Sequence, residues 1–378
     1  MKEDLPVLID TAEKLASSIL DLERYNLLAL DTELDSYFSY QDQICLVQIS
    51  TPDQDYLFDP LAIDLTPLAP IFTDQKRITI FHAGMNDIPH LKHEFNFNFS
   101  NIFDTYIAAG ALNYPKRGLA VLIQQHFGVT LDKQYQRADW RQRPLPEEMM
   151  QYARYDTSYL FDLRLALLKE LEQKNRLEEA QYAFAQTIAT EFHPKECDHT
   201  GWAKIKGLNS LPRRCYGIVR ELFEWREREA KRSNIQPFRI MPDHVLLQLA
   251  GSPPKSEHAL RDMGIRYLDF FPNQATAIYN AILVGKRCGS IPLPKPKRSK
   301  RIILRMKEQQ RLHQLKEWRA ATVTRDDIAP EFLLTNSELF ALSQAAPTTI
   351  DALHSSHILP PHVVRKYGQE ILSVLNKL

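Results

Sequence analysis

Cysteine is scarce in this sequence. Four cysteines occur in 378 residues, and no two of them form a C-x-x-C pair. Four cysteines are too few for a disulfide framework that stabilises a chain of this length, and we therefore expect free thiols. No apolar run approaches the roughly 20 residues that span a bilayer, and the N-terminal segment MKEDLPVLID has acids where a secretory signal carries a basic flank. These absences predict a cytoplasmic protein with no membrane association.

The phosphate-binding motif of ATP-driven motors is also missing. No G-x-x-x-x-G-K-[ST] segment is present, so no role for ATP is expected. The composition is otherwise that of a folded protein, with 44% hydrophobic and 25% charged residues. At about 150 residues per domain, the length predicts two or three domains. We expect a monomer, although no residue pattern bears on the oligomeric state.

The formal net charge of zero conceals an asymmetry between the two halves of the chain. Residues 1–200 contain 18 Lys and Arg against 31 Asp and Glu, whereas residues 201–378 contain 29 against 16. An acidic first half suits carboxylates that bind metal, and a basic second half suits contacts to phosphate. Simple solvation of both surfaces explains the asymmetry equally well.

Short apolar runs bounded by polar and turn residues predict strands in the first half of the chain. They are expected at 26–34, 43–50, 55–59 and 77–83. Helical patterns occupy 11–21, 86–95, 104–113, 118–127 and about 146–173. This mixture predicts an α/β layer structure with a central sheet. No strand-like alternation follows residue 205, so the second half is expected to be all helical.

An internal repeat with an offset of 93 residues runs through the second half. ELFEWRE at 221–227 falls on QLKEWRA at 314–320, and the same offset aligns Leu246 with Leu339 and Pro254 with Pro347. The pattern predicts two copies of a small helical module. Between them, 285–307 holds three alternate-spaced prolines and nine basic residues, which predicts a linker. The expected division is a first domain at 1–195, helical domains at 208–288 and 308–378, and a basic linker at 289–307.

Two carboxylates end an otherwise apolar strand. Asp31 and Glu33 alternate in LLALDTE, so both side chains should lie on one face of the sheet at its edge. Two like charges this close repel each other and are costly to bury, which favours a cation between them. The alternative to a bound cation is that the strand reaches solvent at this point, so that both carboxylates are simply hydrated.

Three further residues extend this acidic set. Asp87 begins a helix in FHAGMNDIPHL, where an N-terminal cap is the commoner role. Tyr152 and Asp156 lie one turn apart on a predicted helix and share a face, as ordinary surface pairs also do. Together the four acids supply the hard oxygen ligands that Mg²⁺ and Mn²⁺ prefer.

These motifs resemble those of the ribonuclease D family of 3′→5′ exonucleases, in the subgroup with four acidic residues and a tyrosine. The matching segments are Asp31-Thr32-Glu33, Asn86-Asp87 and Tyr152-Ala153-Arg154-Tyr155-Asp156, together with FDTYIAAGAL at 103–112, GLAVLIQQHFGV at 118–129 and DWRQRPL at 139–145. Residues 221–265 resemble the helicase-and-ribonuclease-D C-terminal (HRDC) module. The resemblance covers essentially the whole chain.

The resemblance implies a ribonuclease H-like exonuclease domain, with a mixed central sheet and flanking helices, followed by two all-α HRDC-like domains. It also implies two divalent metal ions, Mg²⁺ or Mn²⁺. Asp31 would contact both ions, Glu33, Asp87 and Asp156 would complete their shells, and Tyr152 would orient the attacking water. The second module departs from the first, with Glu331 where the first has Phe238.

Other residues near the expected cleft carry weaker signals. Lys116, Arg117, Arg137, Trp140 and Arg141 offer basic and stacking groups for nucleic acid, or else form a solvated loop. His82 is expected to be structural, and Asp104 is expected to cap a helix.

The predicted function is metal-dependent 3′→5′ exoribonuclease activity, with transfer RNA precursors as the substrate class that the resemblance implies. A DNA 3′→5′ exonuclease is one alternative, because the same site can cleave either backbone. A nucleic-acid-binding scaffold with an inactive nuclease domain is the other.

Overall fold

A six-stranded mixed sheet organises the first part of the computed structural model, which describes residues 5–132, 134–270, 273–294 and 304–376. The strand order is β1-β4-β3-β2-β5-β6. β3 and β4 are antiparallel, while β1 pairs with β4, β2 with β5, and β5 with β6 in parallel. The strands are β1 (Val7–Ile9), β2 (Leu27–Leu34), β3 (Ile44–Ser50), β4 (Asp55–Phe58), β5 (Ile78–Phe81) and β6 (Ile102–Asp104). The four predicted strands are confirmed, and the three-residue strands β1 and β6 were not predicted.

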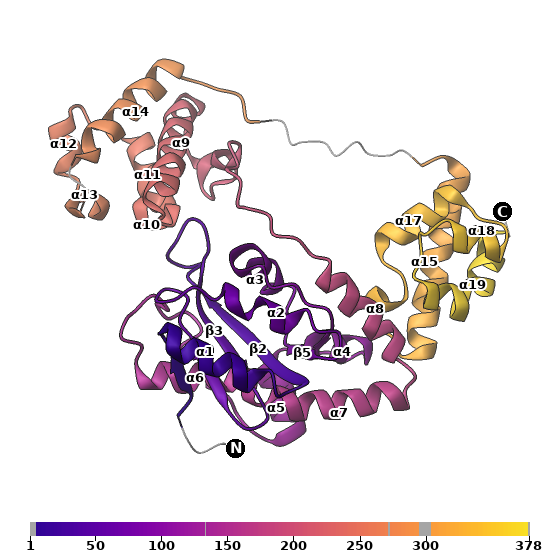
Figure 1. Ribbon diagram of the computed structural model, residues 1–378. Helices are drawn as coiled ribbons and strands as arrows, with labels where there is room; N and C mark the ends of the chain where they lie inside the picture. The colour runs from indigo at the N-terminus through magenta and orange to yellow at the C-terminus, as the bar shows by residue number, and fades with distance from the viewer. Residues whose placement is uncertain (1–4, 133, 271–272, 295–303, 377–378) are drawn as a thin grey trace. The chain divides into compact units, whose positions relative to one another are not determined.

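Helices cover both faces of this sheet (Figure 1), which explains why every residue of β3 is buried. They are α1 (Ala12–Leu22), α2 (Ala69–Phe72), α3 (Ile88–Phe95), α4 (Thr105–Ala111), α5 (Leu119–Phe127), α6 (Glu147–Ser158), α7 (Leu160–Gln173) and α8 (Leu177–Ile188). The single helix predicted over 146–173 is wrong, because the structure divides it at Tyr159. The break lets α6 pack on β3 and β4 while α7 packs on β5.

Only helices and turns follow residue 200 in the described part of the chain, as predicted. The first module comprises α9 (Tyr216–Ser233), α10 (Pro237–Ile240), α11 (Asp243–Gly251), α12 (Glu257–Arg261), α13 (Arg266–Phe270) and α14 (Gln274–Cys288). The second comprises α15 (Met306–Asp326), α16 (Pro330–Leu333), α17 (Asn336–Ala345), α18 (Ile350–Ser355) and α19 (Pro361–Leu375). The short helix α13 separates α12 from α14 and has no counterpart between α18 and α19, so the 93-residue register ends there.

Up to that point the helices of the two modules coincide at the offset of 93, apart from small differences at their ends. Leu246 and Leu339 are both fully buried, as the repeat requires. Arg226 Nη1 donates to the carbonyl oxygen of Met241 at 2.7 Å. At the same offset of 93, Arg319 Nη1 donates to the carbonyl oxygen of Leu334 at 2.7 Å. The sequence repeat is therefore a structural repeat, with one arginine in each copy fastening the long first helix to the following loop.

The described residues form two compact units that do not follow the linear domain order. One unit joins the sheet and its helices to the second module, and Lys366 Nζ donates to Glu179 Oε1 across that junction at 2.5 Å. The other unit joins the first module to residues 34–43, the segment between β2 and β3. Helix α14 ends at Cys288 and α15 begins at Met306, close to the predicted linker limits. The linker residues 295–303 lie outside the described residues.

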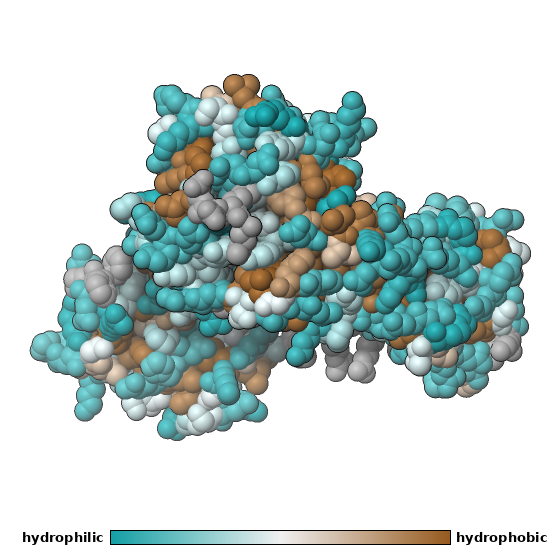
Figure 2. Space-filling model, turned by 90° about the horizontal axis from the view of Figure 1, so that it is seen from below, coloured by the Kyte–Doolittle hydropathy of each residue, from teal (hydrophilic) through white to brown (hydrophobic). Residues whose placement is uncertain are grey.

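No helix in the described ranges is long and apolar enough to cross a membrane. The face shown in Figure 2 is mostly hydrophilic, with hydrophobic side chains in small scattered patches. All four cysteines are free thiols, as predicted.

Candidate active site

The alternating acids of β2 open into a cavity of about 370 Å³. Asp31 and Glu33 both line it, so the strand places the two carboxylates on one face as its period of two requires. Tyr152 and Asp156 from α6 line the same cavity. The remaining lining residues are Thr32, His82, Gly118, Leu119, Ala120, Val121, Leu131, Asp132 and Gln136.

Asp87 joins this group through Thr32. It occupies the N-cap position of α3, yet its side chain makes no capping hydrogen bond. Its Oδ1 instead accepts a short hydrogen bond from the Thr32 hydroxyl, between Asp31 and Glu33 on β2. Asp87 is buried, and its charge contributes to raising the pKa of Asp31. The alternative interpretation of Asp87 as a helix cap is therefore wrong for its side chain.

The side chain of Asp104 holds the loop that carries Asp87 by accepting hydrogen bonds from its backbone. This buried carboxylate accepts from the backbone N–H groups of Tyr106 and Ile107, which confirms its predicted role as the N-cap of α4. It also accepts from Ala83 N at 3.1 Å and Gly84 N at 2.8 Å, at the start of the Asp87 loop. Asp104 thus positions the loop and has no free edge suited to a fifth ligand.

A buried polar network fixes α6, the helix that presents Tyr152 and Asp156. Arg154 points away from the cavity, and its Nε lies 2.9 Å from Asp55 Oδ2 of β4 in an ion pair that is almost fully buried. Ser50 of β3 donates to Asp55 Oδ1 at 2.6 Å and lies 2.7 Å from the Thr157 hydroxyl. The helix face opposite the site is therefore tied to two strands, which sequence reasoning did not foresee.

The electrostatics of the site are those of crowded, buried acids. Burial raises the pKa of Asp31 well above its ordinary range, and the charges of Asp87, Asp156 and Glu33 raise it further. Burial also raises the pKa of Glu33, with help from Asp156 and Asp87. Burial raises the pKa of Asp87 to about 6, against the lowering effect of the Thr32 hydrogen bond, and that of Asp156 to about 7. Each carboxylate therefore resists ionisation unless positive charge is supplied.

This donor set fits divalent metal ions. In the described part of the chain, no group of three or more Asp, Glu, His or Cys side chains already converges as a metal centre. All four acids offer hard oxygen ligands, and none of them forms a salt bridge with a basic side chain among the described ion pairs. The chemistry of the residues thus matches Mg²⁺ or Mn²⁺.

His82 faces the cavity as a neutral ring. Burial lowers its pKa to about 4. Its Nδ1 lies 2.9 Å from the Thr105 hydroxyl, which donates its own hydrogen to the carbonyl oxygen of Phe81 at 3.0 Å. A hydroxyl has one hydrogen, so His82 Nδ1 must be the donor and Nε2 carries the lone pair. The hydrogen bond to Thr105 fixes the orientation of the ring, and the structural role of His82 stays a prediction.

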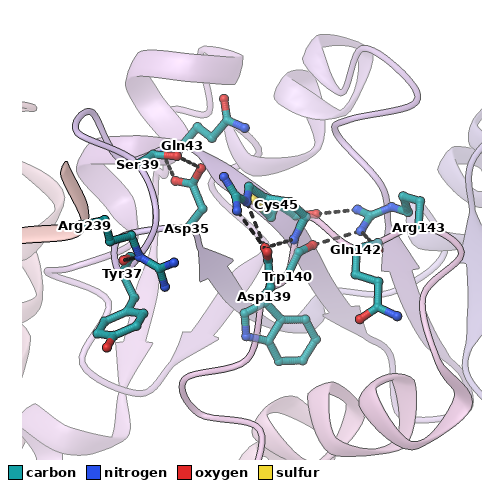
Figure 3. A network of polar contacts seen from close by, with 11 residues as sticks. Asp35, Tyr37, Ser39, Gln43, Cys45, Asp139, Trp140, Gln142, Arg143 and Arg239 are labelled. Atoms are coloured by element: carbon teal, nitrogen blue, oxygen red, sulfur yellow. Dashed lines mark hydrogen bonds and ion pairs between the residues drawn. The ribbon is translucent and has the colours of Figure 1, made fainter. Parts of the chain in front are cut away.

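The segment DWRQRPL at 139–145 attaches to the sheet and does not offer a surface on which bases could stack. Trp140 is 1% exposed and packs in a core cluster with Leu46 and Ala153, so its predicted contact with nucleic acid is wrong. Arg143 Nη2 donates to Asp59 Oδ1 at 2.7 Å. It also donates to the carbonyl oxygen of Cys45 at 2.9 Å (Figure 3). The indole of Trp140 is buried because removing its large apolar area from water stabilises the segment before α6.

The basic residues predicted to contact nucleic acid differ in their surroundings. Lys116 and Arg137 are exposed. Arg117 Nη2 pairs with Glu331 Oε1 of the second module at 2.8 Å, and Arg141 Nε pairs with Asp139 Oδ1 at 2.8 Å. The last two cations are already neutralised in part, so Lys116 and Arg137 are the better candidates for phosphate contacts.

A mixed sheet whose strand β2 shares a cavity with α6, so that three acids and a tyrosine line it and a fourth acid is hydrogen-bonded to Thr32, is compatible with a nuclease domain of the 3′→5′ exonuclease class. Residues 6–172 match the family model described as 3′-5′ exonuclease, and residues 217–267 and 308–375 match the HRDC domain. The chain belongs to the ribonuclease D family, with one exonuclease domain and two HRDC domains.

Named relatives agree with this assignment. Ribonuclease D of Gluconacetobacter diazotrophicus is 31% identical over 301 residues, which cover 78% of this chain and 76% of that protein. Exosome complex exonuclease RRP6 of Saccharomyces cerevisiae is 31% identical over 67% of this chain but only 37% of its own length. The crystal structure of the catalytic core of RRP6 from Trypanosoma brucei superposes with a TM-score of 0.69 at 27% identity, over 75% of this chain and 80% of that one. The chain thus spans about a third of the yeast exosome protein.

Proposed function

We propose that this protein is a metal-dependent exoribonuclease that removes nucleotides from the 3′ end of RNA and releases nucleoside 5′-phosphates. The observation that carries the proposal is the meeting of Asp31, Glu33, Asp156 and Tyr152 in one cavity, with Asp87 attached through Thr32. In the described ranges none of the four acids forms an ion pair with Lys or Arg, and a buried carboxylate without such a partner is costly to ionise unless a ligand supplies positive charge.

Asp31, Glu33, Asp87 and Asp156 would hold two divalent cations. When bound, such ions lower the pKa of a water molecule and stabilise charge on the leaving oxygen of the phosphodiester. The protein itself contributes position: β2 fixes two of the carboxylates, α6 fixes a third, and Asp104 fixes the loop of Asp87.

Tyr152 would orient the attacking water by hydrogen bonding. Burial raises its pKa, and the charges of Asp156, Glu33 and Asp31 raise it further. A phenol with a raised pKa stays protonated at neutral pH, so it can donate a hydrogen bond but cannot act as a general base. Its ring is held in place by Tyr135 and Trp140, whose centroids lie 5.9 and 6.0 Å away.

RNA is the proposed substrate because relatives that cover most of this chain are ribonuclease D proteins. Within that class we propose the 3′ tails of transfer RNA precursors. The basic second half, together with Lys116 and Arg137, would contact phosphates. We also propose that the protein acts in the cytoplasm as a monomer.

The test is the product formed from a single-stranded RNA labelled at its 5′ end, incubated with the purified full chain and Mg²⁺ or Mn²⁺. Stepwise shortening from the 3′ end with release of nucleoside 5′-phosphates is expected, and Asp31→Asn should abolish it while leaving the fold unchanged. A matched DNA tail degraded faster than the RNA would favour the DNA exonuclease alternative. Absence of any product with either metal would support the scaffold alternative.

A further inference from the structure

The segment between β2 and β3 is bound to the first helical module by a set of backbone contacts. Gln236, just before α10, donates from its side-chain nitrogen to the carbonyl oxygens of Ser36 at 2.6 Å and Ser39 at 2.7 Å. Its backbone N–H donates to the carbonyl oxygen of Phe38 at 3.1 Å. These contacts fix the loop, so its side chains have defined positions relative to α10.

The loop is also rigid within itself. Asp35 accepts hydrogen bonds from the hydroxyl of Ser39 and from the backbone N–H of Gln43, the latter at 3.0 Å (Figure 3). The carboxylate thus closes the turn that contains Tyr37. An aromatic side chain at the tip of such a turn is presented at a lower entropic cost than one on a free loop.

Two aromatic rings meet at this junction and remain open to solvent. The centroids of Tyr37 and Phe238 lie 5.3 Å apart with an angle of 49° between the planes. Tyr37 is 51% exposed and Phe238 is 43% exposed. The exposed area of these two rings adds nothing to the stability of the fold, because only apolar area that is removed from water contributes hydrophobic stabilisation.

A cation completes the cluster. The guanidinium of Arg239 lies 4.9 Å from the ring centroid of Tyr37 and 4.2 Å from that of Phe38. Its Nε donates to the carbonyl oxygen of Tyr37 at 3.1 Å (Figure 3). Arg239 is itself exposed. Aromatic faces beside an arginine are the elements from which single-stranded nucleic-acid sites are built.

The second module shows that the fold of the module does not require these side chains. At the repeat offset of 93, Phe238 corresponds to Glu331 and Arg239 corresponds to Phe332. Glu331 pairs with Arg117 at 2.8 Å, so the equivalent position in the second copy serves attachment to the sheet-bearing domain. Because α10 and α16 are both four-residue helices that begin with proline, the module can form this turn without Phe238, and its exposed ring calls for an explanation outside the module's own folding.

Covalent geometry limits how far the cluster can lie from the proposed catalytic strand. Tyr37 follows Glu33 by four residues. A chain extends by at most about 3.6 Å per residue, so the Cα atoms of these residues cannot be more than about 15 Å apart. This upper limit is within the length of a few extended nucleotides upstream of a 3′ end that is cleaved beside Glu33.

We propose that Tyr37 and Phe238, supported by Arg239, form a platform on which bases of single-stranded RNA stack upstream of the cleaved nucleotide. The platform rests on the proposed function, since it deepens the description of the same substrate. Stacking is tolerant of sequence because every base has a flat face, which suits an enzyme that removes successive nucleotides. RNA is favoured over a protein partner because the chain from residue 201 onward carries an excess of basic residues.

The experiment measures binding of a single-stranded RNA to the full chain in the Asp31→Asn background, which prevents cleavage. A second RNA has the same phosphates but abasic sugars at the upstream positions. The parent should bind the normal RNA more tightly than the abasic one. Phe238→Ala and Tyr37→Ala should each weaken binding of the normal RNA by about 5- to 100-fold and remove the discrimination, since stacking of one base supplies an affinity change of that order.

Two controls separate stacking from loss of structure. Phe238→Trp keeps a flat aromatic face and should restore discrimination. Tyr182→Ala removes another exposed ring, which is 38% exposed on α8, and should leave affinity for both RNAs unchanged. Unchanged discrimination in both alanine variants overturns the platform, as does an equal loss of affinity for normal and abasic RNA. A protein ligand that requires Phe238 while RNA binding does not would also overturn it.

A small substrate distinguishes failure of the platform from failure of the proposed function. The p-nitrophenyl ester of a nucleoside 5′-phosphate has no upstream nucleotides, so its cleavage by the wild-type chain depends on the catalytic cavity and not on the platform. No cleavage of ester or RNA by the wild type, with discrimination intact, would end the proposed hydrolysis but not the platform. Cleavage of ester and RNA by the wild type, with equal affinity of the Asp31→Asn chain for normal and abasic RNA, would end the platform but not the proposed hydrolysis.

Discussion

Thr32 donates its hydroxyl hydrogen to Asp87, which links the centre of β2 to the start of α3 across 55 positions of sequence. The threonine lies between two of the proposed metal ligands and holds a third. Its side chain is buried, so water cannot easily replace the hydrogen bond.

Thr32→Val should therefore weaken the metal site without removing a carboxylate. A lost buried hydrogen bond to a charged group corresponds to about 1.5–3 kcal/mol, so divalent-ion affinity should fall by one to two orders of magnitude. Titration with Mn²⁺ measures the effect. Thr32→Ser keeps the hydroxyl and should retain most of the affinity; equal loss in both variants would show that the methyl group, not the hydrogen bond, matters.

Neutralising one of the acids should stabilise the metal-free protein. Burial raises the pKa of Asp156 to about 7, so the folded state holds this proton more tightly than the unfolded chain does. Ionisation of Asp156 thus opposes folding as the pH rises from about 4 towards 7. Asp156→Asn should raise the free energy of unfolding at pH 7.5 by on the order of 1–3 kcal/mol, and the gain should disappear as the pH falls to about 4.

With divalent ions present, the wild type should become more stable than Asp156→Asn. A ligand that binds only the folded state raises Tm, so Mg²⁺ or Mn²⁺ should stabilise the wild type and have a much smaller effect on Asp156→Asn. Thermal unfolding in chelator and in metal, at the two pH values, measures both effects. A lower Tm for Asp156→Asn in chelator at pH 7.5 would contradict the account of Asp156 as a buried carboxylate whose ionisation opposes folding.

The ion pair beneath α6 gives a stability prediction away from the cavity. Arg154→Met leaves Asp55 as a buried charge without its partner, which typically costs about 3–5 kcal/mol. Adding Asp55→Asn removes that charge and should recover most of the loss. Denaturant unfolding of the single and double variants measures the coupling; a double variant no more stable than Arg154→Met would show that Asp55 is satisfied by Ser50 alone.

The repeated arginines predict local effects in each module. Removing Arg226 or Arg319 leaves a loop carbonyl without its donor, a cost of about 1–3 kcal/mol. Arg226→Met should increase hydrogen exchange within 217–288 and not within 308–375, and Arg319→Met should do the opposite. Equal changes in both ranges after either substitution would show that the modules are not independently fastened.

Much of the fold followed from local pattern. The run LLALDTE predicted both a strand and the common face of Asp31 and Glu33, and the offset of 93 predicted helices whose buried leucines coincide. β1 and β6 escaped prediction because three residues are too few to show alternation.

Contacts distant in sequence could not be predicted in the same way. The partners of Thr32 and Arg154 depend on strand register and helix docking, which no local pattern encodes. Trp140 was misassigned because a basic loop with an aromatic residue fits either a binding surface or a buried anchor. Residues 34–43 gave no sequence sign that they would pack with a helical module about 200 positions away.

The most direct test of the central claim is anomalous diffraction from crystals of the full chain soaked with Mn²⁺ and a nucleoside 5′-monophosphate. We predict two manganese peaks about 3.5–4 Å apart, bound by oxygens of Asp31, Glu33, Asp87 and Asp156, with the Tyr152 hydroxyl directed towards the phosphate. Manganese bound only elsewhere, or these four side chains unchanged and without metal at saturating Mn²⁺, would contradict it.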